Sequence, residues 1–322
     1  MKNQFSEGIK DMQQLKILTV GSANMDLMLN VDRVPAAGET VLSDGGVAYI
    51  PGGKGANAAL AFAKLGAHSV FSAKLGADVH GQQLFKYYKE SGIDTSYIKV
   101  DRDCPTGFAA IMKENNGQNR IILYPGANEH LLADNLLEAF SSSPDALYLN
   151  FEISFQTALS AAKIAASRNI PIFLDAAPAD KNMPIEALPY LEIFSPNETE
   201  TAELCGILPS GADSSLRASL ALWRRVKCKY IVIKQGARGA CVYDGKHFDM
   251  IPAARVPKVV DTTAAGDTFT AALTLEYMRT GDVKAAAKYA AAAAAVAVSR
   301  FGASSSIPTV AEVMSFIQNG SV

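Results

Sequence analysis

The residues best suited to chemistry form one short run near the C-terminal end of the chain, Asp261-Thr262-Thr263-Ala264-Ala265-Gly266-Asp267. Small side chains let the backbone approach a ligand, and the apolar spacing over residues 269–278 predicts a helix that begins here. The first turn of a helix offers free N–H donors and a positive dipole end to an anion. Asp267 adds a carboxylate that can accept a proton from a hydroxyl. The run therefore suits phosphoryl transfer, with an ordinary capped helix start as the alternative.

A second group of small residues, between a predicted strand and a predicted helix, reads Pro51-Gly52-Gly53-Lys54-Gly55-Ala56-Asn57-Ala58. Gly53, Gly55 and Ala58 match the G-x-G-x-x-A fingerprint of dinucleotide-binding proteins, and Asp78 lies about 20 residues further on. An NAD-dependent dehydrogenase is therefore a remote alternative. The fingerprint usually follows the first strand of its domain, however, and this function would leave residues 261–267 unexplained.

The same glycine-rich turn also suits a sugar. Its glycines bring backbone N–H groups close to a polyol, while Lys54 and Asn57 offer donors and an acceptor to the hydroxyls. Asn24 and Asp26 lie two residues apart after the first predicted strand, so they point the same way if that segment is extended. A carboxylate beside an amide suits a vicinal diol, although a capped turn would explain this pair as well.

Composition narrows the class of protein. The chain has 322 residues, of which 49% are hydrophobic and 19% charged, as in a globular protein. A net charge of −2 without a Lys/Arg-rich run argues against nucleic acid or an anionic membrane surface as a partner. The four cysteines form no Cys-x-x-Cys pair, and no signal peptide or membrane-length apolar run is seen, so we expect a cytoplasmic protein.

Strand-like runs alternate with helical patterns. Residues 17–21 precede a helical pattern at 56–65, residues 69–74 one at 82–91, and residues 146–151 one at 158–167. The strand-like runs 170–175 and 192–195 precede a helical pattern at 198–205, and the helical pattern at 216–227 precedes the strand-like run 230–234. This alternation predicts a single α/β domain, with a mostly parallel sheet flanked by helices. Two segments, approximately 27–50 and 105–124, contain strand-like pieces without a helix, and the second has a hairpin signature with a polar turn at 114–117. We expect them to form a small lid sheet whose edges support a homodimer.

These motifs together resemble those of the PfkB-type sugar kinases, ribokinase and its relatives, over residues 15–308. Residues 21–26 are similar to the sugar-binding opening of that family, residues 51–57 to its first signature, and residues 261–269 to its second. The three motifs occur in the order and spacing of the family. The resemblance implies a ribokinase-like three-layer sandwich with a small β-sheet lid.

The activity that the resemblance implies is ATP-dependent phosphorylation of the primary hydroxyl of a pentose, D-ribose to D-ribose 5-phosphate in the first place. Deoxyribose, fructose and adenosine are alternative substrates. Asp267 would be the catalytic base, and backbone N–H groups of Ala264, Ala265 and Gly266 would stabilise the transferring phosphoryl group. The sugar-binding residues would be Asn24, Asp26, Gly52, Gly53, Lys54, Asn57 and Glu152.

The resemblance also implies ATP, Mg²⁺ and K⁺ as cofactors. Asn197 and Glu200 match the Asn-x-x-Glu motif that helps to place Mg²⁺ through water, although the same spacing is a helix capping box. The segment Lys234-Gln235-Gly236-Ala237-Arg238-Gly239 resembles the nucleotide-binding loop. The potassium ligands would be Asp261, Thr263, Ala297, Arg300, Gly302 and Ser306.

Overall fold

A nine-stranded sheet forms the centre of the computed structural model, which describes residues 14–114 and 118–320. Its order is β13-β12-β11-β10-β9-β8-β1-β4-β5; neighbours from β11 to β5 are parallel, and β12 and β13 are antiparallel. The strands are β1 (Lys16–Val20), β4 (His68–Gly76), β5 (Ile98–Asp101), β8 (Ala146–Leu149), β9 (Ile172–Asp175), β10 (Leu191–Ser195), β11 (Cys228–Lys234), β12 (Ala240–Tyr243) and β13 (Phe248–Ile251).

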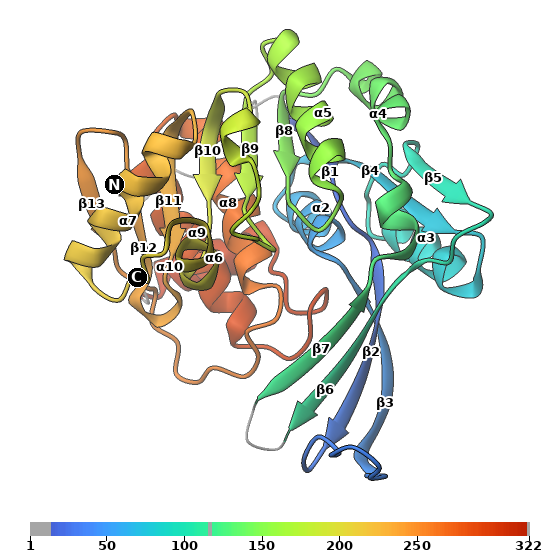
Figure 1. Cartoon of the computed structure of the whole chain (residues 1–322). Helices are drawn as coiled ribbons and strands as arrows, with labels where there is room; N and C mark the ends of the chain where they lie inside the picture. Colours follow the sequence, from blue (N-terminus) through green and yellow to red (C-terminus); the bar gives the residue numbers. More distant parts are fainter. Residues whose placement is uncertain (1–13, 115–117, 321–322) are drawn as a thin grey trace.

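Helices cover both faces of this sheet, as Figure 1 shows. Alternate residues of each strand point to opposite faces, so Ile17 packs in one hydrophobic cluster and Leu18 in the other. The predicted sheet flanked by helices is thus observed. The helices are α2 (Lys54–Lys64), α3 (Val79–Glu90), α4 (Ala133–Ala139), α5 (Phe155–Ser167), α6 (Glu198–Cys205), α7 (Ala212–Arg225), α8 (Ala265–Thr280), α9 (Val283–Val298) and α10 (Val310–Gln318).

A second sheet of four strands projects from one end of these layers (Figure 1). It has the order β3-β2-β6-β7, in which β2 and β6 are parallel and the outer pairs antiparallel. The strands are β2 (Asn24–Val31), β3 (Ser43–Gly52), β6 (Gly107–Glu114) and β7 (Asn119–Tyr124). The two segments predicted to lack helices therefore pair with each other. Residues 115–117 of the predicted turn, like residues 1–13, lie outside the described residues.

Several predicted helices begin earlier than apolar periodicity indicated. The helices expected at 82–91 and 158–167 begin at Val79 and Phe155. Polar capping residues explain the difference, because the Asp78 side chain accepts from the Gly81 N–H and that of Ser154 from the Thr157 N–H. The helices expected at 56–65 and 216–227 begin at residues 54 and 212. Within the described ranges, no helix is long and apolar enough to cross a membrane.

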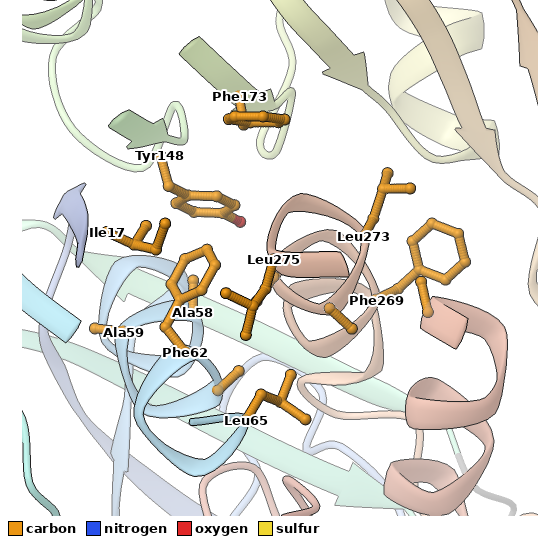
Figure 2. Packing of buried hydrophobic residues seen from close by; sticks show 14 of the residues in the cluster. Ile17, Ala58, Ala59, Phe62, Leu65, Tyr148, Phe173, Phe269, Leu273 and Leu275 are labelled. Carbon is orange, nitrogen blue, oxygen red and sulfur yellow. The ribbon is translucent and has the colours of Figure 1, made fainter. Parts of the chain in front are cut away.

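Close packing between α2 and the sheet depends on Phe62, which is fully buried (Figure 2). Its ring meets that of Tyr148 edge to face, with 5.4 Å between the centroids. We expect Phe62→Ala to lower the free energy of unfolding by about 3–5 kcal/mol, because it leaves a cavity between layers. Urea denaturation would measure the loss. Phe85→Ala on the exposed side of α3 is the matched control, and an equal loss in both variants would contradict the expectation.

Candidate active site

The predicted sugar and phosphate motifs meet where helices α2 and α8 begin. The Asn57 side chain, on the first turns of α2, donates a hydrogen bond of 2.8 Å to Oδ2 of Asp267, on the first turn of α8. Both side chains are buried. This contact joins residues 210 positions apart in the chain, so the two motifs form one site.

Glycines let the backbone of the turn before α2 lie directly against β1 and β2. A Cβ atom on Gly55 would be 2.5 Å from the backbone nitrogen of Ser22, and one on Gly52 would be 2.0 Å from Oδ2 of Asp26. Gly53 has a φ of 91°, which other residues rarely adopt. The glycine-rich segment therefore places the start of α2 in contact with the loop between β1 and β2.

Glu152, just after β8, holds the sugar-side turn together. Its Oε2 atom accepts hydrogen bonds from Ser22 Oγ at 2.5 Å, the backbone N–H of Lys54 at 2.8 Å and Asn24 Nδ2 at 3.4 Å. The carboxylate thus connects β2 to the start of α2. Asn150, which precedes it, is fully buried and its Nδ2 has no hydrogen-bond partner among the described residues.

Asn128 belongs to the same site, although sequence analysis did not identify it. It is 1% exposed and donates from Nδ2 to Oδ1 of Asn24 at 2.7 Å, while its Oδ1 accepts from the Ala23 N–H at 2.9 Å. The amide therefore fixes the orientation of Asn24. No local pattern marks this role, because the partners are 104 positions apart.

Asp26 faces the site with no hydrogen bond to its carboxylate from the described part of the chain. Burial raises its pKa to about 7, with further contributions from the nearby Glu152 and Asp267 carboxylates. The buried Asp26 carboxylate thus has oxygen atoms whose capacity to accept hydrogen bonds is unused by the described residues. It is therefore suited to accept hydrogen bonds from the hydroxyls of a ligand.

Lys54 provides positive charge in the middle of these acids. Burial disfavours its ammonium form, yet the carboxylates of Asp267, Glu152, Asp175 and Glu200 raise its pKa above the usual value. Its ammonium makes no hydrogen bond or ion pair within the described ranges. The lysine is therefore charged and available to a polar ligand.

The N-terminus of α8 offers unpaired donors beside Asp267. Ala264 adopts a left-handed conformation with a φ of 59°, which is uncommon for a residue other than glycine. The N–H groups of Ala264 and Gly266 donate to no acceptor in the described chain, whereas that of Ala265 donates to the Thr262 carbonyl at 3.3 Å. Burial raises the pKa of Asp267, against the opposing effect of the Lys54 charge. The geometry suits an anion next to a proton acceptor.

Lys234 is the last residue of β11, and its ammonium group reaches α8, where it donates to the Thr270 hydroxyl at 3.1 Å. Its ammonium lies 2.5 Å from Oδ2 of Asp175, the last residue of β9. Sequence analysis did not select Asp175, although an acid at the carboxyl end of a parallel strand is a recognisable signal. The loop that follows is a tight turn, in which the Gln235 N–H donates to the Gly239 carbonyl at 2.7 Å. Gly236 and Gly239 have φ values of 51° and 90°.

Asn197 and Glu200 form the capping box that was the alternative interpretation. Asn197 Oδ1 accepts from the Glu200 N–H at 2.9 Å, and the Glu200 carboxylate accepts from both nitrogens of Asn197 at 2.7 Å. Burial raises the pKa of Glu200, partly offset by Lys234. No cluster of three His, Cys, Asp or Glu side chains suited to a metal ion occurs in residues 14–114 and 118–320. These residues fit a metal held mainly by water and phosphate oxygens.

Apart from Ala297, in the last turn of α9, the predicted potassium ligands lie on two neighbouring loops, since the Gly302 N–H donates to Oδ2 of Asp261 at 3.4 Å. The backbone carbonyls of Thr263, Arg300 and Gly302 accept no hydrogen bond from the described residues. Such free oxygens fit a monovalent cation. The Ala297 carbonyl, in contrast, accepts from the Arg300 N–H at 3.1 Å, and the Ser306 hydroxyl donates to the Ala303 carbonyl at 2.8 Å.

Comparison with known proteins identifies the family. The model of the pfkB family carbohydrate kinases matches residues 14–310. The chain belongs to this family. The predictions of a carbohydrate kinase and of the ribokinase-like fold are therefore confirmed. The dehydrogenase alternative is wrong: Gly53 is the N-cap of helix α2, directly after β3 of the small sheet, and Gly55 and Ala58 lie in the first turns of that helix.

Individual relatives cover almost the whole chain. Ribokinase of Haemophilus influenzae is 33% identical over 308 residues, which cover 94% of this chain and 99% of the relative. Deoxyribokinase of Salmonella typhi is 29% identical over 305 residues, with coverage of 94% and 99%. The structure of Arabidopsis thaliana ribokinase complexed with ribose and ATP superimposes with a TM-score of 0.85 at 30% identity, over 95% of this chain and 99% of that chain.

The raised pKa of Asp26 makes stability depend on pH. The unfolded chain loses this proton near pH 3.8, while the folded protein keeps it to about pH 7, so unfolding becomes easier as pH rises through this window. We expect the melting temperature of the wild type to fall relative to Asp26→Asn between about pH 4 and about pH 7. Differential scanning calorimetry would measure it. The exposed Asp134→Asn on α4 serves as the control, and parallel curves for wild type and Asp26→Asn would refute the assignment.

Proposed function

We propose that this carbohydrate kinase transfers the γ-phosphoryl group of ATP to the primary hydroxyl of D-ribose, giving D-ribose 5-phosphate. The observation that carries the proposal is the hydrogen bond between Asn57 and Asp267, which unites a polyol-binding turn with a base at an anion-binding helix start. The names of the ribokinase relatives and the ribose and ATP of the Arabidopsis thaliana complex support the same substrates.

The sugar would lie between the two helix starts. Asp26 accepts hydrogen bonds from a vicinal diol, the Asn24 amide and the Lys54 ammonium contribute donors, and Asn128 keeps Asn24 oriented. The glycine turn at 52–53 lets the ring approach the backbone. An anionic group on the sugar would face both Asp26 and Glu152. An unphosphorylated sugar is therefore the favoured substrate class.

The transfer needs one proton acceptor and a site for the moving charge. Asp267 accepts the proton of the primary hydroxyl while that oxygen forms its bond to Pγ. The bond from Pγ to the bridging oxygen breaks, and its electron pair remains on the β-phosphate of ADP. The free N–H groups at the start of α8 stabilise the phosphoryl oxygens during this step. The raised pKa of Asp267 makes it a better acceptor than an exposed aspartate.

Nucleotide and ions would bind on the other side of Asp267. The loop that starts at Lys234, with Gln235, Gly236 and Gly239, would hold the nucleotide. Mg²⁺ would be held through water by Asn197 and Glu200 and would neutralise phosphate charge. K⁺ would be held by Asp261 and by the carbonyls of Thr263, Arg300 and Gly302, with Ala297 and Ser306 as further ligands. It would keep the loop before α8 in its anion-binding shape.

The decisive test is ADP release from Mg-ATP with ribose, deoxyribose, fructose, adenosine and fructose 6-phosphate, each with and without K⁺. We expect the fastest turnover with ribose, increased by K⁺. Asp267→Asn should reduce turnover by about 10²–10⁴-fold, because the proton acceptor is lost. Ribose binding by the variant, followed by calorimetry, should persist.

Asp282→Ala, at the N-cap of α9 beyond the C-terminal end of α8, is a control for general damage to the fold. If another sugar gave the fastest turnover, the assignment of ribose as the substrate would be wrong, but the kinase mechanism would stand. An Asp267→Asn enzyme with wild-type turnover would remove the assigned base.

The small sheet would act as a lid and as a dimer interface. Strand β7 is exposed along its whole length, and the strand register puts exposed apolar side chains of β7 and β3 on one face of the sheet: Ile122, Tyr49 and Val47, at 65%, 57% and 58% exposure. Such a surface is typical of a sheet that a second copy covers. We expect a dimer by light scattering, and Ile122→Lys should shift the mass towards that of a monomer. A monomeric wild type at assay concentration would contradict the interface.

The compartment would be the cytoplasm. All four cysteines are free thiols, and Cys228 and Cys241 are buried in the hydrophobic layers. Burial raises the pKa of Cys228 to about 12 and that of Cys241 to about 11, so these thiols are unreactive. Unpaired cysteines of this kind fit a reducing environment.

A further inference from the structure

A buried ion pair below the start of α8 has no assigned part in the transfer. The ammonium of Lys234 lies 2.5 Å from Oδ2 of Asp175, and the two side chains are only 10% and 1% exposed. Thr270, on the second turn of α8, joins them. Its hydroxyl donates to Asp175 Oδ2 at 2.7 Å and accepts from Lys234 Nζ at 3.1 Å.

An ion pair at this depth is a poor way to stabilise a fold. Removing two charges from water costs several kcal/mol per ion, and neutral side chains of similar volume often serve equally well. Here the charges also lie beside other ionised groups, since both Asp175 and Lys234 affect the pKa of Asp267. The arrangement is therefore better explained by a function for the ammonium group.

The ammonium lies next to the anion-binding donors. A Cβ atom added to Gly266 would be 3.9 Å from Lys234 Nζ, and beyond its two chain neighbours no other described side chain lies within 4 Å of that point. A lysine ammonium has three N–H donors, of which Asp175 and Thr270 take two. The third has no acceptor in the described residues. A phosphate at the free Gly266 N–H would therefore face a fixed positive charge.

We propose that Lys234 is a catalytic residue that donates its third N–H to the phosphoryl group in transfer, and that Asp175 is a positioning residue that holds it. This inference rests on the proposed kinase function. When the sugar oxygen bonds to Pγ, its proton goes to Asp267 and the electron pair of the broken bond stays on ADP. Lys234 gains and loses no proton in this step. It stabilises the phosphoryl oxygens by charge alone.

A role in transfer differs from a role in holding ATP. A lysine that binds ATP and the transition state equally would change KM for ATP and leave kcat unaltered. A lysine that acts on the moving phosphoryl group changes kcat. Steady-state kinetics on suitable variants therefore separates the two roles.

The variants must avoid an isolated buried charge. Lys234→Met leaves Asp175 unpaired, so the main variant is the neutral pair Asp175→Asn/Lys234→Met. We expect its kcat with ribose to fall by about 10²–10³-fold, as for loss of one oxyanion donor, with KM for ATP within about three-fold of wild type. Lys234→Arg should recover part of the lost kcat. In a double-mutant cycle, Asp175→Asn should have little further effect once Lys234 is replaced.

The chain offers a matched control at the other end of β11. Lys229 pairs with Glu192 at 2.7 Å, away from the site. Glu192→Gln/Lys229→Met should keep the wild-type kcat. Calorimetry provides a readout besides turnover: the neutral pair at 175 and 234 should weaken binding of ADP with aluminium fluoride, a mimic of the moving phosphoryl group, and leave binding of ADP alone nearly unchanged.

The outcomes distinguish this inference from the kinase function itself. If the wild type phosphorylates ribose and the folded neutral pair has the same kcat, Lys234 is not catalytic and the proposed function stands. The catalytic role of Lys234 would also be overturned if the neutral pair changed only KM for ATP and bound ADP more weakly by the same factor with and without aluminium fluoride. A wild type that phosphorylates no sugar in the panel would remove the function, and the inference with it.

Discussion

The site depends on two helices that start at the same point. Helix α2 begins against β1 and β2, helix α8 begins more than 200 positions later, and the bond from Asn57 to Asp267 ties their first turns together. The first N–H groups of α2 already donate to Glu152 and Ser22, so the free donors and positive dipole end that suit an anion come from the start of α8. Gly55 makes the position of α2 possible, because any side chain there would collide with the backbone at Ser22. The sugar-side turn and the anion-binding start of α8 are therefore joined by a single hydrogen bond.

The buried charged groups of the site lower the stability of the fold when no ligand is bound. Burial raises the pKa values of Asp26, Glu200 and Asp267, and these acids share their space with Lys54 and Lys234. The charges are close together in a site that excludes much of the water, so each affects the others. Asp26 has no donor from the described chain, whereas Lys234 is held tightly. Such an uneven arrangement is typical of a site that ligands complete.

The small sheet contributes residues to the site. Strand β2 follows β1 after a short turn and carries both Asn24 and Asp26, so movement of this sheet would move the sugar-side residues with it. A second link runs through β6, where Lys113 lies 3.7 Å from Asp261, at the start of the loop before α8. The small sheet thus carries the sugar-side residues and also contacts the loop that leads to Asp267.

Sequence alone determined the layers and the motifs, because both depend on local patterns. Periods of two and 3.6 residues separated strands from helices, and the small-residue runs at 51–58 and 261–267 identified the two helix starts. Tertiary structure decided the rest. Asn128 belongs to the site through a hydrogen bond to Asn24, 104 positions away. Asp175 belongs to it through Lys234 and Thr270, which are 59 and 95 positions away. Pairings over such distances leave no spacing signal in the sequence. Only the fold could show that Asp26 has no donor among the described residues while Lys234 and Asp175 are buried together, since burial and charge depend on which strands become neighbours.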